Sequence, residues 1–146
     1  MRLYLDICCL KRPFDDQGQA RIRMESEAVL GLLALPAERV QFLRSRAHDL
    51  ENDQNPVAWR AARVREWLAA QPLIETPEGA LLARTRDLVE LGFGAFDALH
   101  LASAESAMAS AFITVDDGLI VTARRSAAAL KVVAREPVGF LSEVVS

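Results

Sequence analysis

Short apolar runs alternate along the chain with segments of helical periodicity. Leu3-Tyr4-Leu5 and residues 111–115 are continuous apolar runs of the length expected for buried strands. Residues 39–43 carry apolar side chains at alternate positions, and residues 73–75 and 130–134 are shorter runs bounded by polar residues. The pattern therefore predicts strands at these places.

Between the strands, apolar residues recur at the spacing of amphipathic helices. The predicted helices cover residues 22–35, 45–55, 57–70, 77–92, 94–110 and 118–129. Ser45 is placed to cap the second of these helices, and Asn55-Pro56 stops it. We expect a polar loop over residues 11–21 and a short tail after residue 134.

Strands that alternate with helices predict right-handed crossovers and a mostly parallel sheet covered on both faces. The predicted fold class is α/β, a three-layer α/β/α sandwich with a central, mostly parallel sheet. A chain of 146 residues is long enough to bury a core without disulfides or metals. We expect one domain over residues 1–146.

Composition narrows the classes of protein. The formal charge is −3, so no global positive field attracts nucleic acid, although a local basic patch is compatible with this charge. The two cysteines are adjacent and offer neither a disulfide framework nor a zinc motif. The longest apolar run, residues 28–37, falls short of the roughly 20 residues that span a bilayer. We expect a cytoplasmic protein with no membrane segment.

Acidic residues stand where a parallel sheet would bring them to one edge. Asp6 and Asp116 follow predicted strands, and Asp97 opens a predicted helix whose dipole favours its ionised form. Taken singly, Asp97 is explained equally well as a helix cap and Asp116 as a turn residue. Asp6 lies between apolar residues and needs a partner, either a metal ion or an arginine. Mg²⁺ and Mn²⁺ prefer such oxygen ligands.

Three segments in order carry a family resemblance. Leu3-Tyr4-Leu5-Asp6, Phe96-Asp97-Ala98-Leu99-His100-Leu101-Ala102 and Phe112-Ile113-Thr114-Val115-Asp116-Asp117 together resemble a PIN domain, the fold of the VapC-type toxin ribonucleases. The resemblance covers almost the whole chain.

The resemblance implies an active site of four acids and a Mg²⁺ or Mn²⁺ cofactor. The catalytic residues that it implies are Asp6, Glu51, Asp97 and Asp116, and the metal ligands are Asp6, Asp97 and Asp116 with Asp117 beside them. Asp49 or Glu27 are the alternatives to Glu51. Thr114 matches the hydroxyl that family members place near the acids. One ion and two ions both remain open.

The function that the resemblance implies is that of a metal-dependent endoribonuclease, which hydrolyses RNA as the toxin of a toxin–antitoxin pair. The implied partners are an RNA substrate, a small antitoxin protein and a second copy of the chain in a homodimer. Many PIN domains follow the first Asp with Thr or Ser and then Asn or Ser, whereas this chain has Ile7 and Cys8. This difference supports an alternative, a PIN-like module that binds nucleic acid or protein but cleaves weakly or not at all.

Other polar residues have less specific interpretations. His100 lies three positions after Asp97 on one helix and is able to pair with it, but packing is the favoured role. Trp59 and Trp67 are expected to pack or to lie at an interface. Basic residues flank the first acid and form either a phosphate-binding rim or a solvated arm: Lys11, Arg12, Arg21 and Arg23.

Overall fold

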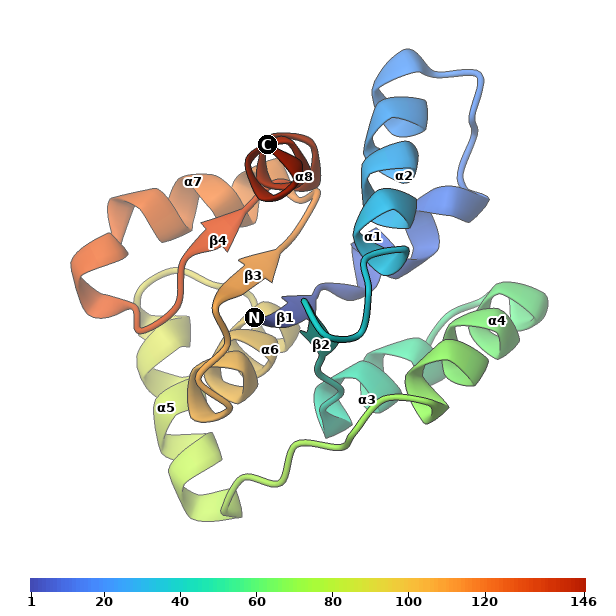
Figure 1. Cartoon of the computed structure of the whole chain (residues 1–146). Coiled ribbons are helices and arrows are strands. Elements are labelled where there is room, and N and C mark those ends of the chain that lie inside the picture. The colour runs from blue at the N-terminus through green and yellow to red at the C-terminus, as the bar shows by residue number, and fades with distance from the viewer.

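The apolar runs of the sequence form the strands of one sheet. The computed structural model describes residues 1–146, and its four strands are all parallel in the order β2-β1-β3-β4 (Figure 1). The strands are β1 (Arg2–Leu5), β2 (Gln41–Phe42), β3 (Ala111–Ile113) and β4 (Ala134–Arg135). Helices flank the sheet, so the predicted three-layer α/β/α sandwich with a mostly parallel sheet is confirmed.

Eight α-helices and two 3₁₀ turns connect and cover these strands. The first half of the chain holds α1 (Ile7–Lys11), the turn η1 (Arg12–Phe14), α2 (Ala20–Leu33), α3 (Arg46–Asp53) and α4 (Ala58–Ala69). The second half holds α5 (Glu78–Glu90), α6 (Ala95–Ser106), α7 (Asp117–Arg125), the turn η2 (Ala127–Ala129) and α8 (Pro137–Val145).

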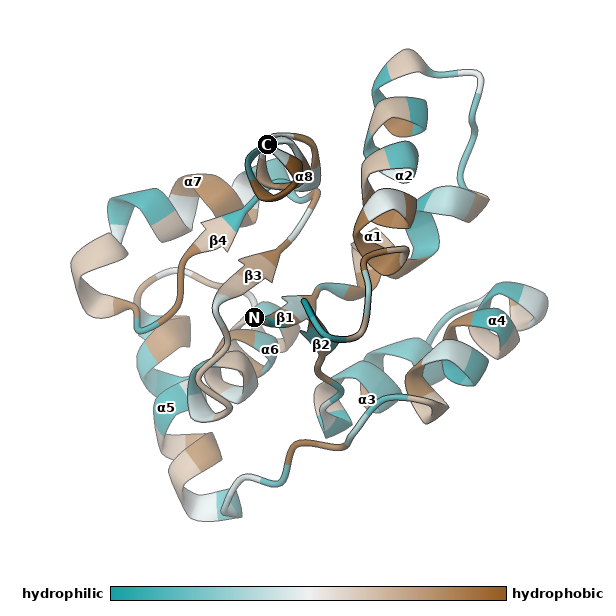
Figure 2. Cartoon of the chain, in the orientation of Figure 1, coloured by the Kyte–Doolittle hydropathy of each residue, from teal (hydrophilic) through white to brown (hydrophobic).

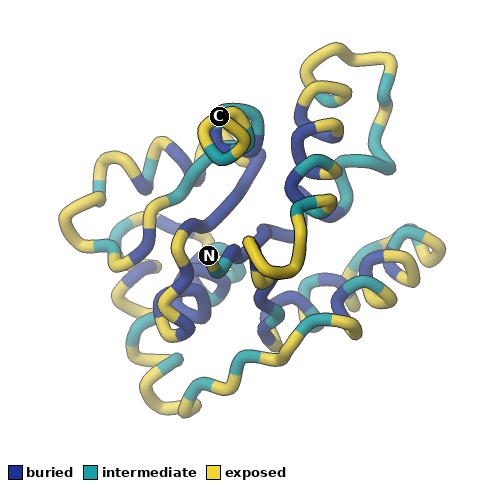
Figure 3. The backbone as a smooth tube through the Cα atoms, in the orientation of Figure 1, coloured by how far each residue is buried: buried dark blue, intermediate teal, exposed yellow.

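Side chains that alternate along β1 enter two separate cores. Leu3 and Leu5 pack with residues of α1, α2, α4 and α8, whereas Tyr4 packs with residues of α5, α6 and α7. The central strands β1 and β3 are buried for most of their length, while the loop before α2 is largely exposed (Figure 3). In Figure 2, α3 is coloured mostly hydrophilic, which is consistent with a helix that brings polar side chains to a site.

The connection that follows β1 and the connection that follows β3 cover opposite faces of the sheet. The path from β1 to β2 runs through α1 and α2 on one face, and the path from β3 to β4 runs through α7 on the other. In open parallel sheets, such a reversal opens a crevice beyond the carboxyl ends of the central strands. The fold therefore places a binding site after Leu5 and Ile113.

The strand predicted over residues 73–75 is wrong. Only one parallel bridge forms there, between Arg44 and Leu73, and Leu73 is partly exposed. Pro72 and Pro77 flank the segment, and proline nitrogens cannot donate to a strand ladder. The segment therefore links α4 to α5 without becoming a strand.

Two helices are missing from the sequence prediction. Helix α1 occupies residues that directly follow the first strand, and α8 occupies the predicted tail. Pro137 opens α8, and the Glu136 carboxylate accepts hydrogen bonds from the backbone N–H groups of Val138 and Gly139. The strand predicted over residues 130–134 is shorter and later, at Ala134–Arg135.

Several predicted boundaries agree with the structure. Ser45 is the N-cap of α3, and that helix ends before Asn55-Pro56. Gly92 follows α5 with φ +112°, a left-handed conformation that residues with a Cβ rarely adopt. No helix combines the length and the apolar character needed to cross a bilayer.

We expect the same substitution, leucine to alanine, to have different effects on stability at a buried and at an exposed position of α2. Leu32 is 0 % exposed and Leu30 is 52 % exposed in the same helix. Leu32→Ala should lower the free energy of unfolding by about 2–5 kcal/mol, because it leaves a cavity in the core. Leu30→Ala should change it by less than about 0.5 kcal/mol. Urea denaturation measures both, and equal losses for the two variants would contradict the packing of α2.

Candidate metal centre

Asp6 lies at the carboxyl end of β1 and is almost fully buried. Its backbone N–H donates to the Ile113 carbonyl at 2.9 Å, which extends the pairing of β1 with β3 by one residue. The residue is only 4 % exposed, and its Oδ2 accepts a hydrogen bond from the Thr114 hydroxyl at 2.8 Å. No arginine or lysine pairs with it, so the arginine alternative for its partner is excluded. Burial raises the pKa of Asp6, partly offset by His100 and Thr114.

Thr114 connects the ends of the two central strands. Its Oγ1 donates to Asp6 and accepts the backbone N–H of Asp116 at 3.1 Å. The Cys8 thiol lies 3.4 Å from the same oxygen. Because the hydroxyl proton is directed to Asp6, the Cys8 S–H is the donor in the latter contact. Cys8 therefore takes part in the polar surroundings of Asp6.

Asp97 is the third residue of α6, and it does not cap that helix. Gly94 is the N-cap residue and no side chain caps the helix start. The pKa of Asp97 is raised to about 6 by burial and then by the negative charges of Asp6, Asp116 and Glu51. The expectation that the helix dipole favours ionisation is therefore wrong in its net effect, because burial and like charges outweigh the dipole.

Asp116 and Asp117 are neighbours in the chain and both are exposed, but their partners differ. Asp116 is the N-cap of α7, and its Oδ1 accepts the backbone N–H of Leu119 at 3.1 Å. Its charge also acts on Asp97. The Asp117 carboxylate is exposed and pairs with Arg21 at 2.6 Å. Only Asp116 of the two takes part in the acid cluster.

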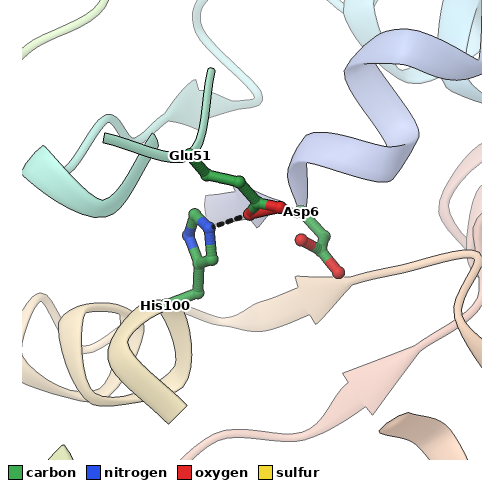
Figure 4. Close-up of side chains that lie close together, drawn as sticks. All are labelled: Asp6, Glu51 and His100. Atoms are coloured by element: carbon green, nitrogen blue, oxygen red, sulfur yellow. Dashed lines mark hydrogen bonds and ion pairs between the residues drawn. The ribbon is translucent and has the colours of Figure 1, made fainter. Parts of the chain in front are cut away.

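Glu51 extends from α3 to the cluster. It is Glu51, and not Asp97, that pairs with His100. The His100 Nε2–H donates to Glu51 Oε1 at 2.7 Å, and Figure 4 shows this contact beside Asp6. Of the alternatives to Glu51, Asp49 forms two hydrogen bonds to Arg44, at 3.1 and 2.9 Å, and Glu27 is exposed on α2. The structure brings Glu51 to Asp6 and neither alternative.

A buried chain of hydrogen bonds supports His100 from behind. The Tyr4 hydroxyl lies 2.6 Å from His100 Nδ1 and 2.6 Å from Ser45 Oγ. Burial raises the pKa of Tyr4, so the hydroxyl keeps its proton. His48 Nδ1 accepts the Ser45 N–H and its Nε2–H donates to the Leu5 carbonyl, while burial lowers the pKa of His48 to about 3. His48 is therefore a neutral structural residue.

These supporting residues carry no signal in the sequence. In the sequence, Tyr4 belongs to an apolar run and Ser45 appears as a helix cap. Neither pattern therefore indicates a contact with the acid cluster. Tyr4 contacts Ser45, which is 41 positions away in the sequence, and His100, which is 96 positions away. Only the fold brings these residues together.

The side chains at this edge can hold a metal ion. One ligand atom from each of Asp6, Glu51 and His100 lies within 4.8 Å of the others, and Asp97 and Asp116 act on the same region. The Nε2–H of His100 is donated to Glu51. The atoms available as metal ligands are therefore mainly carboxylate oxygens. Such a donor set suits a hard divalent cation. The residues present therefore fit a metal centre.

Comparison with known proteins agrees with this fold. Neither models of protein families nor curated proteins match the sequence. Among solved structures, the match defines the class of fold: the PIN-like α/β fold of a VapC-type protein.

One matching chain belongs to the crystal structure of VapBC2 from Rickettsia felis bound to a DNA fragment from their promoter. The TM-score is 0.54 at 12 % sequence identity, over 93 % of this chain and 98 % of the other. At this identity the match concerns the fold alone. The predicted resemblance to a PIN domain is confirmed at that level.

We expect the ionisation of Asp97 to make the stability of the folded protein depend on pH. Its pKa is about 6 in the folded protein and near 3.8 ordinarily, so the folded state holds a proton that the unfolded chain loses between about pH 4 and 6. The stabilisation is present below that window and is lost as the pH rises through it. His48 changes stability in the opposite direction, because its pKa is lowered.

The comparison with Asp97→Asn removes the contribution of His48, which both proteins share. Without metal, the melting temperature of the wild type relative to Asp97→Asn should fall between about pH 4.5 and 7, as measured by circular dichroism. Mg²⁺ or Mn²⁺ should reduce that fall. Parallel pH curves for the two proteins would contradict the repulsion among the acids.

We expect Tyr4→Phe to destabilise the protein through its buried hydrogen bonds. The substitution leaves Ser45 Oγ and His100 Nδ1 without a buried partner, which costs about 1–3 kcal/mol. Urea denaturation of Tyr4→Phe, Ser45→Ala and the double variant measures the coupling. The double variant should lose less than the sum of the single losses. Strictly additive losses would contradict the chain of hydrogen bonds.

Proposed function

We propose that the protein is a metal-dependent endoribonuclease that hydrolyses RNA phosphodiesters. The observation that carries this proposal is the closeness of Asp6, Glu51 and His100, whose ligand atoms lie within 4.8 Å of one another, with Asp97 near enough that, in addition to burial, the charges of Asp6, Asp116 and Glu51 raise its pKa. The similarity of the fold to that of a VapBC2 chain supports the same class of function.

The two other buried acids of the chain differ from Asp6, which is the buried acid of this cluster. The Glu105 carboxylate is held by Arg84 at 2.7 and 3.1 Å, and Glu25 lies 3.5 Å from both Arg12 and Arg21. In these two places an arginine balances the buried carboxylate, as burial of charge requires. An external cation is the natural counterpart of a cluster that lacks arginine.

The proposed ligands of the ion, Mg²⁺ or Mn²⁺, are Asp6, Asp97 and Asp116. When bound, the ion would polarise the phosphodiester and lower the pKa of the attacking water. Glu51 completes the site or orients the water, and His100 fixes the direction of its carboxylate. We leave Asp117 out of the ligand set because Arg21 holds it.

We further propose that the protein is the toxin of a toxin–antitoxin pair, held in check by a small antitoxin and acting as a homodimer. The matched structure is named as a VapBC2 assembly, and this chain has surfaces for partners. A groove of about 780 Å³ lies between α3, α5 and α6, and the partly exposed side chains of Leu50 and Leu82 line it. Such apolar surface is typical of protein contacts.

A second candidate is a PIN-like binding module that cleaves weakly or not at all. The observation in its favour is Cys8, whose thiol contacts Thr114 where many PIN domains carry a hydroxyl or an amide. A thiol is a weaker hydrogen-bond donor, so it holds Thr114 and Asp6 less firmly. Assays of RNA cleavage and of metal binding separate the two candidates.

We expect Mn²⁺-dependent cleavage of a structured RNA that Asp97→Asn lowers by at least about 100-fold, because one charged ligand is lost. Gel analysis of the RNA with Mn²⁺ and with EDTA measures the rate. The control is Asp87→Asn, an exposed acid on α5 outside the cluster, and it should cleave like the wild type.

Two results would count against the proposal. Cleavage that survives in Asp97→Asn would remove the assigned site, since a contaminating nuclease would behave in this way. Metal binding by calorimetry without any cleavage would favour the binding module.

A further inference from the structure

A continuous row of ion pairs runs from the start of α4 to the start of α7. Three arginines alternate in it with three acids, and we call this set of six side chains the arginine row. Its contacts are Arg60 Nη1 to Asp15 Oδ1 at 3.2 Å, Asp15 Oδ2 to Arg12 Nη1 at 3.2 Å, Arg12 Nε to Glu25 Oε1 at 3.5 Å, Glu25 Oε2 to Arg21 Nε at 3.5 Å, and Arg21 Nη2 to Asp117 Oδ1 at 2.6 Å. These six side chains come from α4, the η1 region, α2 and α7.

The row runs from an aromatic surface to Asp117, which adjoins the acid cluster in the sequence. At one end Asp117 is the neighbour of Asp116. At the other end Trp59 is 56 % exposed, and the Arg60 guanidinium lies 5.5 Å from the centre of its ring. Phe14 meets Trp59 edge to face, with ring centres 5.4 Å apart, and holds it in place. In Figure 1, the chain runs from β1 into α1, and α1 and α2 lie on the same side of the sheet's central strands.

With 56 % of its surface exposed, Trp59 is not a core residue, and of the two expected roles only a position at an interface agrees with this exposure. Trp67, the other tryptophan, packs edge to face on Phe42 with ring centres 5.5 Å apart, as a packing residue does. An exposed, braced ring beside a guanidinium is a platform on which a nucleobase stacks, and such stacking is tolerant of sequence.

Two acids of the row, Asp15 and Asp117, are accessible to a competing phosphate, whereas Glu25 is buried. Asp15 lies between Arg12 and Arg60 and contacts Nη1 of each at 3.2 Å, while Nε of Arg12 has only the ion pair with Glu25 at 3.5 Å and Nε of Arg60 is buried without a hydrogen-bond acceptor. Arginine binds phosphate through two nitrogens at once, which these contacts with Asp15 do not achieve. The exposed pair of Arg21 with Asp117 contributes little stability, so a phosphate displaces it at small cost.

We propose that Arg12, Arg21 and Arg60 bind the backbone of single-stranded RNA and that Trp59 stacks on one of its bases, which guides the strand to the acid cluster. The identity of the ligand as RNA rests on the proposed function, while the site itself lies outside the acids. An acidic protein segment would also pair with the arginines, but it has no planar base for Trp59. The stacking platform therefore favours nucleic acid.

Tryptophan fluorescence in EDTA tests the platform without cleavage. In Trp67→Phe the only tryptophan is Trp59, and an unstructured oligouridine RNA should quench it. In Trp59→Phe the remaining signal from Trp67 should stay unchanged on the same titration. Trp59→Ala should weaken binding of fluorescently labelled RNA by about 5- to 100-fold, measured by anisotropy.

Matched arginine variants test the row. Arg60→Ala should weaken RNA binding and reduce the slope of log affinity against log salt by about 0.7, as the loss of one phosphate contact does. Arg63→Ala, an exposed arginine of the same helix without an ion pair, should leave the slope unchanged. Asp15→Asn should strengthen binding about 2- to 5-fold, since it removes the competing carboxylate.

The outcomes separate this proposal from the nuclease itself. RNA that binds, or is cleaved with Mn²⁺, while Trp59 is not quenched would overturn the platform and leave the nuclease standing. Quenching without cleavage would support the platform and favour the binding module. Quenching by a polyglutamate peptide but not by RNA would overturn the proposal in favour of an acidic protein partner.

Discussion

β1 and β3 pair in the middle of the sheet, and their register determines both cores and the acid cluster. Leu5 pairs with Ile113, so the next residues, Asp6 and Thr114, come together and form their hydrogen bond at 2.8 Å. A slip of one residue would exchange the faces of Tyr4 and its neighbours and would separate Asp6 from the hydroxyl. The hydrophobic pattern that buries the strands therefore also assembles the site at their ends.

The acid cluster works against the stability of the protein without a cation. The pKa of Asp97 is raised because ionisation must overcome burial and the charges of Asp6, Asp116 and Glu51. A site adapted only for stability would place an arginine there, as Arg84 stands beside Glu105. Repulsion of this kind, concentrated at the carboxyl edge of a parallel sheet, is typical of functional sites.

The sequence predicted the parts of this protein that depend on local pattern. Apolar runs located β1 and β3, and position at the strand ends made Asp6 and Asp116 candidates, although Asp116 taken singly was explained equally well as a turn residue. The helix α8 and the absence of a strand at residues 73–75 were missed, because short apolar segments satisfy strand and helix patterns equally well. The partner of His100 was beyond prediction, since Glu51 lies 49 positions away and reaches it only through tertiary packing.

The two sides of the acid cluster are built from different interactions. On the inner side, Glu51 is held through His100 and Tyr4 by short hydrogen bonds, and breaking the bond between His100 and Tyr4 leaves buried polar atoms unpaired. On the outer side, Arg21 and Asp117 form an exposed pair that water and salt replace at little cost. A ligand that approaches the cluster from the outer side therefore first contacts the exchangeable pair of Arg21 and Asp117. It contacts the rigid carboxylate of Glu51 last. The site is therefore bordered by a readily exchangeable ion pair on one side and by a rigid chain of buried hydrogen bonds on the other.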